Sequence, residues 1–208
     1  GAVDITVDLG ARLLTGTVGR VGGSGFVLTT YSKISARHRL RVWLMLLALT
    51  AGAPPPAEGW TAHAIGRGRG GGASHVRLGP VPADLATAVL RDLAAVYDRG
   101  MREPIPFSPK TSYAYAETMW RSSRKHETPA LHRARGEWLG DRFDGENADA
   151  AIRTLYGPRP PLDVLCGAAG TDERWAGGPA YESAIATRLG HYAMRVWAPA
   201  LAAEVWRG

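Results

Sequence analysis

The sequence predicts an α/β fold in which a mixed central sheet with an antiparallel hairpin is flanked by helices and followed by a helical C-terminal extension. Three segments within residues 1–31 alternate apolar and polar side chains, the period-2 pattern of half-buried strands. An apolar stretch with helical spacing follows at 35–53, and longer helical patterns dominate the rest of the chain. We therefore expect one domain, cut from a longer polypeptide, with a sheet-rich part at 1–80 and a mainly helical part at 81–208.

The first 31 residues are expected to form three strands. Alternating apolar residues mark the first strand at 3–7, and similar patterns place the second at 12–21 and the third at 26–31. The sequence GGSG at 22–25 supplies a flexible reversal. We expect the second and third strands to be antiparallel neighbours in the central sheet.

A helix and two further strands complete the sheet-rich part. Ser35 is the expected N-cap of a helix whose apolar positions recur until the prolines at 54–56. Strands are expected at 60–66 and 74–78. The glycine-rich segment GRGRGGG at 66–72 has the spacing G-x-G-x-x-G, but no helix is expected after it, so we interpret it as a loose surface loop and not a nucleotide site.

The remaining chain reads as helices separated by proline-rich breaks. Helical patterns cover five segments, at 82–99, 111–121, 127–138, 148–156 and 179–206. Pro199 should kink or divide the last of them. In the break PIPFSPK we expect Phe107, which is flanked by prolines, to dock in an apolar pocket, and we take Phe107 and Lys110 as packing or partner anchors.

Composition limits the possible functions. The chain carries a net charge of +6, and all but three of its 25 basic residues are arginine. This bias fits a polyanionic partner and, equally, a gene of high G and C content. The single Cys166 excludes an internal disulfide and fits either a reducing, cytoplasmic location or a fold that is indifferent to redox conditions. We see no secretory signal, and the apolar run at 42–53 is too short to span a membrane.

Catalytic and metal-binding motifs are absent from the sequence. The six histidines are scattered without metal-ligand spacing, and no G-x-S-x-G elbow is present. Aromatic residues fall at helical spacing, which favours core packing over base stacking. We therefore expect no metal and no cofactor.

The segments 14–21, 27–32 and 39–43 resemble the strand, strand and helix that carry the active site in magnesium nucleases of the PD-(D/E)XK class. At the positions where these enzymes hold two carboxylates and a lysine, this chain has Gly19, Thr30 and Ser32. Lys33 comes one place late and should point to the opposite face of its strand. The resemblance therefore implies a degenerate, inactive nuclease-like domain.

The whole chain also resembles the C-terminal domain of the RecC family, the gamma subunits of bacterial exodeoxyribonuclease V, and its arginine and alanine content suggests a high-GC, possibly actinobacterial, source. Three stretches carry this resemblance, TYSKISARHRLRVWLMLLALTA at 30–51, EPIPFSPKTSYAYAE at 103–117 and HYAMRVWAPAL at 191–201. The resemblance implies a non-catalytic scaffold that contacts RecB, RecD and DNA near the point of strand separation in double-strand break repair and recombination.

The basic residues near the degenerate site are expected to contact DNA; they are Arg20, Lys33, Arg37, Arg39 and Arg41. Two alternatives remain open. An active magnesium nuclease would need relocated acids such as Asp4, Asp8 or Glu58. A free-standing basic DNA-binding module would need only the cations.

Overall fold

The computed structural model describes residues 1–205, apart from the side chains of Arg69 and Glu182. The chain divides into two compact units. The first consists of Gly1–Asp98 with the described residues from Ala202 onward, and the second is Arg99–Leu201. The described residues form a mixed α/β structure with two sheets and seven α-helices.

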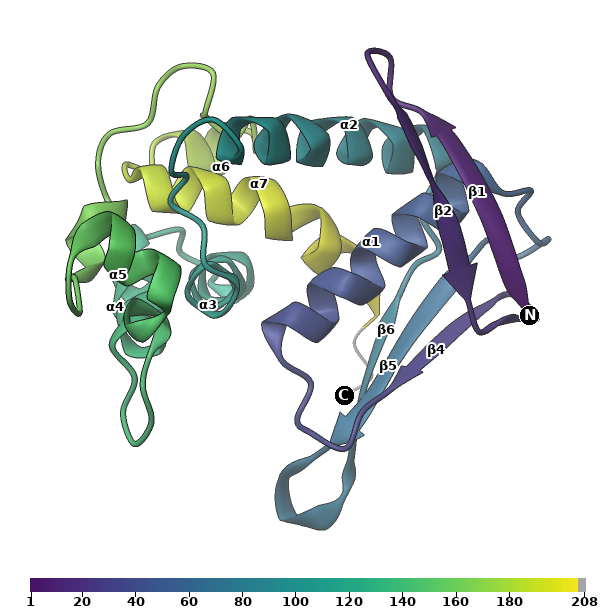
Figure 1. Ribbon diagram of the computed structural model, residues 1–208, viewed down its shortest axis with the longest axis horizontal. Coiled ribbons are helices and arrows are strands. Elements are labelled where there is room, and N and C mark those ends of the chain that lie inside the picture. The colour runs from purple at the N-terminus through teal and green to yellow at the C-terminus, as the bar shows by residue number, and fades with distance from the viewer. Residues whose placement is uncertain (206–208) are drawn as a thin grey trace. The chain divides into compact units, whose positions relative to one another are not determined.

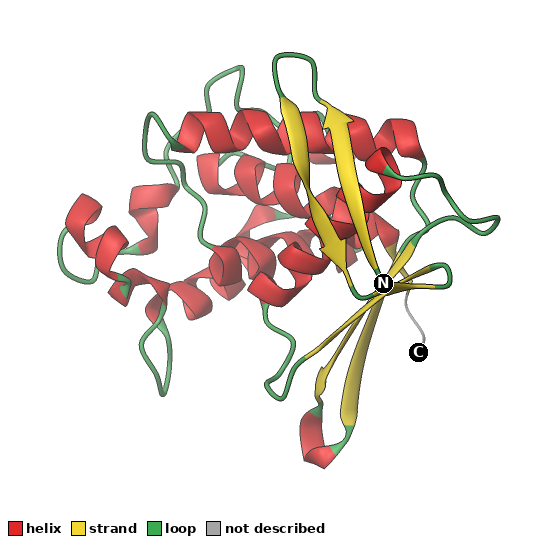
Figure 2. Ribbon diagram, turned by 45° about the vertical axis from the view of Figure 1, so that its right-hand side comes forward, coloured by secondary structure: helices red, strands yellow, loops and turns green. Residues whose placement is uncertain are grey.

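Strands β1 (Ala2–Asp8) and β2 (Leu13–Gly19) form a separate two-stranded antiparallel sheet, visible as a pair of yellow arrows in Figure 2. Ile5 and Val7 are buried on this sheet, as the alternation predicts. They lie against Gly52 at the end of helix α1 (Ala36–Gly52), where an added Cβ would be 2.9 Å from Ile5 Cβ. A side chain at this position would therefore push the hairpin away from the helix.

The second sheet has five strands in the order β3 (Val21–Gly22), β4 (Gly25–Thr29), β5 (Thr61–Arg67), β6 (Ala73–Leu78) and β7 (Glu204–Val205). Strands β4 and β5 are parallel, and the other pairs are antiparallel. Parallel neighbours need a crossover connection, and α1 provides it: the helix links the end of β4 to the start of β5 along the chain and packs on the sheet (Figure 1). The buried apolar residues of the sheet include Phe26, Ala62, Ala64, Val76 and Leu78.

The predicted hairpin of residues 12–21 with 26–31 is wrong over most of its length. Arg20 has a φ of 61°, which breaks the expected strand in two. The part before Arg20 pairs with β1, and only Val21 and Gly22 pair with β4. The third strand also ends at Thr29 and not at residue 31. Alternation of side chains identifies the buried face of a strand but not its neighbour, so the sequence could not distinguish these pairings.

The N-cap of α1 is confirmed. The Ser35 Oγ accepts a hydrogen bond from the His38 N–H, and the His38 Nδ1 accepts one from the Ser35 N–H at 3.1 Å, which together form a capping box. The helix ends before the prolines at 54–56, and the strands expected at 60–66 and 74–78 are also present. The glycine-rich loop between them contains one short 3-10 turn, η1 (Arg69–Gly71).

Four helices beyond residue 81 follow the predicted pattern closely; they are α2 (Ala83–Gly100), α3 (Pro109–Arg121), α4 (Glu127–Leu139) and α5 (Ala150–Tyr156). The segment predicted as one last helix forms two, α6 (Pro179–Glu182) and α7 (Arg188–Ala203), and the short 3-10 turns are η2 (Glu146–Ala148) and η3 (Leu162–Leu165). No helix within the described residues is both long enough and apolar enough to cross a membrane.

The last helix is divided, but not where the sequence predicts. Pro199 lies inside α7, and the break falls at residues 183–187. There the Ala186 and Thr187 N–H groups and the Thr187 hydroxyl all donate to the Glu127 carboxylate, which replaces helical hydrogen bonds. Trp206, the predicted end of this helix, lies outside the described residues.

Buried aromatic side chains form the core of the second unit. Tyr115, Trp138, Tyr192 and Trp197 are all 1 % exposed or less. Each of their polar atoms has a partner: for example, Trp197 Nε1 donates to Ser112 Oγ at 2.9 Å, and Trp138 Nε1 donates to the Pro160 carbonyl at 2.8 Å. Burial with satisfied polar groups confirms that Tyr115, Tyr192 and Trp197 are core residues, as their spacing predicted.

Candidate functional site

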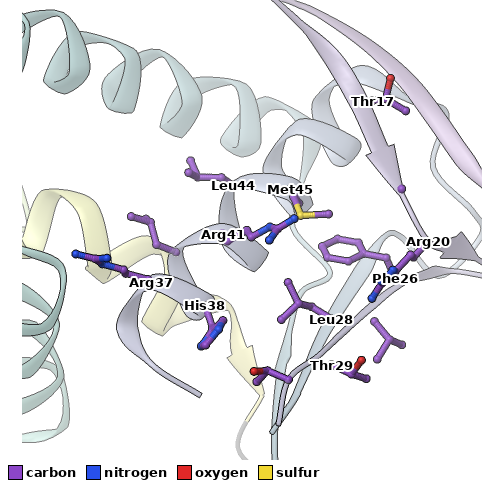
Figure 3. Close-up of a pocket in the computed structure, with 14 residues that line it drawn as sticks. Thr17, Arg20, Phe26, Leu28, Thr29, Arg37, His38, Arg41, Leu44 and Met45 are labelled. Atoms are coloured by element: carbon purple, nitrogen blue, oxygen red, sulfur yellow. The ribbon is translucent and has the colours of Figure 1, made fainter. Parts of the chain in front are cut away.

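A cleft of about 800 Å³ lies in the first unit between α1, β4 and the end of β2. Figure 3 shows Arg41 and Met45 on the side of α1 that faces β4, where Phe26 and Leu28 are located. The cleft is open to solvent, and its walls combine aliphatic side chains with cations. It coincides with the segments that resemble a nuclease active site.

Three arginines line this cleft. Arg37 and Arg41 are four residues apart on α1, so they project from the same face of the helix. Arg20 approaches from the turn between β2 and β3, where its positive φ is a conformation that non-glycine residues seldom adopt. Among the described residues, no aspartate or glutamate lines the cleft, and no carboxylate forms an ion pair with these three arginines. The cleft is therefore electropositive.

The residues at the nuclease-like positions lie in or beside the cleft. Gly19, the last residue of β2, and Thr30, which directly follows β4, both line it. Ser32 does not line it, but its Oγ lies 3.0 Å from the Thr30 Oγ1 in the bend that follows β4. Lys33 is exposed in the same connection, after the strand has ended. The expectation that strand alternation directs Lys33 to the opposite face was therefore wrong, because Lys33 does not lie in a strand.

Arg39 lies on α1 but does not line the cleft. Its guanidinium forms an ion pair with Glu204 of β7, with an Nη1 to Oε2 distance of 2.9 Å. The structure thus brings together Arg20, Arg37 and Arg41 from the predicted basic set, and it leaves Arg39 and Lys33 outside the group of lining residues.

Sequence reasoning missed the α1 residues that complete the wall of the cleft. His38, Leu44 and Met45 line it alongside the arginines. Leu44 is 38 % exposed although it belongs to the most apolar run of the chain. Helical spacing from Arg37 and Arg41 would have placed these residues on the same side of α1, so a signal for them existed.

The acids considered for a relocated nuclease site lie elsewhere. Asp4 accepts a hydrogen bond from the Thr17 hydroxyl at 2.6 Å, Asp8 accepts one from the Gly10 N–H at 2.7 Å, and Glu58 is exposed in the loop after α1. None of the three lines the cleft. Within residues 1–205, no group of three or more histidine, cysteine, aspartate or glutamate side chains is placed to hold a metal ion.

The two predicted anchors lie in the second unit. The Phe107 ring is half-buried and stacks on the Trp197 indole, with 6.5 Å between ring centroids and 23° between planes. Lys110 is exposed, and its backbone N–H donates to Glu146 Oε1 at 3.0 Å. The neighbouring Thr111 N–H donates to the other carboxylate oxygen, so Glu146 caps the start of α3.

A second, smaller cavity of about 460 Å³ in this unit was not predicted. It is lined in part by Arg174, Trp175 and His191. His191 Nδ1 accepts a hydrogen bond from the Trp175 N–H at 3.2 Å. Burial lowers the pKa of His191, and the nearby Arg174 charge lowers it further, so this imidazole acts as an acceptor within the fold.

Comparison with known proteins connects this chain to one family. Residues 1–120 match the family described as the RecC C-terminal domain. The chain is 40% identical over 98% of its length to the RecBCD enzyme subunit RecC of Mycobacterium tuberculosis, and 38% identical over 98% to that of Mycolicibacterium smegmatis. It spans 17% of the length of each of these relatives, which come from the actinobacterial group that the composition suggested. The cleft between α1 and β4 lies inside the matched region, and the chain belongs to the RecC C-terminal domain family.

Proposed function

We propose that this chain is a non-catalytic, nuclease-like scaffold domain of a RecBCD helicase-nuclease. In this role it holds the RecB and RecD subunits and guides DNA during double-strand break repair and homologous recombination. Family membership supports the assignment, since the curated relatives are named as RecC subunits of the RecBCD enzyme.

The composition of the cleft is the observation that carries the non-catalytic part of this proposal. By their resemblance to the nuclease class, Gly19 and Thr30 correspond to its carboxylate positions, and both line the cleft together with three arginines. Magnesium is a hard cation that requires oxygen ligands, usually carboxylates. Glycine offers none, threonine offers a neutral hydroxyl, and like charge on the arginines repels the metal. A cleft of this composition cannot use the metal chemistry by which such nucleases cut.

A free-standing DNA-binding module is the second candidate function. The clustering of Arg20, Arg37 and Arg41 favours it, and Lys33 is exposed in the connection that leads to α1. Arg39 is a weaker candidate because its guanidinium is engaged by Glu204. Binding that depends on phosphate contacts falls steeply with salt, which separates this function from binding to partner subunits.

Co-purification tests the proposal. The tagged chain is expressed with RecB and RecD from the same organism, and labelled single-stranded and duplex DNA are tested in parallel against the chain alone. The proposal predicts that the subunits are retained through a wash at high salt and that the chain alone binds DNA weakly. Tight, strongly salt-dependent DNA binding without retention of either subunit would favour the module instead.

A further inference from the structure

Strand β4 has an open edge inside the cleft. Its partner β3 covers only Gly25 and Phe26, through the pairs Gly22 with Gly25 and Val21 with Phe26. Along Val27–Thr29, no strand of the described chain lies on this side, whereas β5 pairs with the whole of β4 on the other side. Val27 and Thr29, the two exposed residues of this stretch, are β-branched. The stretch contains no lysine or proline, the residues that commonly protect such edges.

The direction of the backbone groups on this edge follows from two observed hydrogen bonds. The Thr30 N–H donates to the Ile65 carbonyl, and the Ser24 carbonyl accepts from the Thr61 N–H, so even-numbered residues face β5. Backbone groups alternate along a strand, so the N–H and C=O of Val27 and Thr29 face the open edge. The edge therefore presents two donors and two acceptors in the spacing of a strand.

The side chains around this edge favour a protein segment of a particular chemistry. Leu28, Leu44 and Met45 supply an apolar wall, and Arg37 and Arg41 lie on the helix beside it. A strand that enters the cleft would find cations for acidic side chains and aliphatic surface for apolar ones. With no acid among the described lining residues, the charge complement is an acidic segment.

The carbonyl groups on the edge distinguish a peptide from a nucleic acid. Phosphodiester oxygens only accept hydrogen bonds, so a nucleic acid backbone in the cleft could engage the two N–H groups but would leave both carbonyls unsatisfied. An extended peptide satisfies donors and acceptors together, and leaving a desolvated acceptor unpaired is costly.

We propose that the cleft is a docking site for an extended, acidic segment of a partner protein, which adds to β4 as an extra strand and places its carboxylates on Arg37 and Arg41. This inference rests on the proposed scaffold function, because it specifies how one partner is held. It assigns the basic cleft to protein recognition and not to DNA.

The direct test measures binding of an acetylated, amidated peptide of alternating glutamate and valine, seven residues long, to the chain by fluorescence anisotropy. The matched peptide has lysine in place of glutamate, and a 15-nucleotide oligo-dT serves as competitor. The proposal predicts saturable binding of the acidic peptide only, without displacement by oligo-dT. Absence of acidic-peptide binding, or its displacement by oligo-dT, would overturn the proposal, and displacement would show a nucleic-acid cleft.

Two variants test the backbone and the charge separately. Thr29→Pro removes an edge N–H that no strand of the described residues uses, so the fold should survive while peptide affinity falls about tenfold. The double variant Arg37→Glu/Arg41→Glu should lower the affinity for the acidic peptide by at least the same factor. The matched control Arg67→Glu/Arg91→Glu makes the same change in net charge outside the cleft and should leave affinity unchanged.

Amide hydrogen exchange on the unaltered chain covers the possibility that Thr29→Pro does not fold. The amides of Val27 and Thr29 should exchange rapidly in the free chain and become protected by the acidic peptide. Unprotected amides under saturating peptide would contradict strand addition. If the peptide fails while RecB and RecD still co-purify, this inference fails and the scaffold function stands.

Discussion

At the residue scale, the buried carboxylate of Glu173 organises charged groups in the second unit. The residue is only 3 % exposed. Its carboxylate accepts hydrogen bonds from Arg188 Nε at 2.7 Å, the Tyr192 hydroxyl at 2.9 Å and the Gly170 N–H at 2.9 Å. Burial alone would raise the pKa of Glu173, but these hydrogen bonds and the Arg188 charge outweigh it and lower the pKa to about 2.

This shift predicts acid sensitivity. Because the pKa of Glu173 in the folded chain lies below its ordinary value of 4.5, the ionised group stabilises the fold above that pH, and the stabilisation is lost as the pH falls toward about 2. Glu173→Gln should lower the free energy of unfolding at pH 7 by about 3 kcal/mol. Urea titrations from pH 7 to pH 3 should show the two proteins converging as the pH falls.

The control for this prediction is Asp172→Asn. Asp172 lies next to Glu173 in the sequence and forms an ion pair with Arg99, but its side chain is 72% exposed, so solvent screens the pair. Its loss should cost less than about 1 kcal/mol. Equal effects of the two substitutions, or a Glu173→Gln difference that does not change with pH, would refute this account of the Glu173 cluster.

Phe107 gives a second prediction at this scale. The sequence predicted a docked ring, and the ring is half-buried on Trp197. Phe107→Ala should therefore lower the free energy of unfolding by about 1 to 2 kcal/mol, less than the roughly 3 kcal/mol expected for a fully buried ring. Phe143→Ala, at an 87 % exposed position, is the control and should leave thermal unfolding unchanged. No change for Phe107→Ala would instead identify Phe107 as a partner-binding residue.

At the element scale, α1 connects the two parallel strands and carries six of the fourteen residues that line the cleft. Its capping box joins Ser35 to His38, which itself lines the cleft. Ser35→Ala should lower the free energy of unfolding by about 1 kcal/mol, because the first turn loses its hydroxyl acceptor. Ser123→Ala, an exposed serine with no hydrogen bond to its hydroxyl in the described structure, should have no measurable effect in the same urea titration. A cost for Ser123→Ala equal to that for Ser35→Ala would argue against the cap.

The elements also show which features local sequence can specify. Helix α1 could be predicted from both ends, because Ser35 and the prolines at 54–56 act on adjacent backbone. The pairing of β2 could not, since it depends on the φ of Arg20 and on contacts with β1 that no local pattern encodes. The division before α7 was missed for the same reason: it depends on Glu127, about sixty positions earlier in the chain.

In the cleft, too, some features could be predicted from local sequence and others depend on distant contacts. Two of the predicted arginines on α1, Arg37 and Arg41, line the cleft. Gly19 and Thr30, which the resemblance to nucleases singled out, also line it, and their correspondence to nuclease carboxylates stays a prediction. The open edge of β4 was not identified, because it arises only when β2 turns away to pair with β1. A short covering strand at β3 is a property of the folded sheet and leaves no local signature.

At the scale of the whole molecule, the central claim is that the chain keeps a nuclease-like cleft without the chemistry of cutting. The measurement is cleavage of linear duplex and single-stranded DNA by purified chain in excess over substrate, with Mg²⁺ or Mn²⁺. The comparison variant Gly19→Asp/Thr30→Asp/Ser32→Lys restores the acids and the cation in sequence. We expect this variant to be weak or inactive, because metal ligands must be held within about 0.5 Å by supporting contacts. The predicted result is intact DNA with the unaltered chain. The contradicting result would be metal-dependent cleavage that EDTA abolishes and that co-elutes with the chain through two columns.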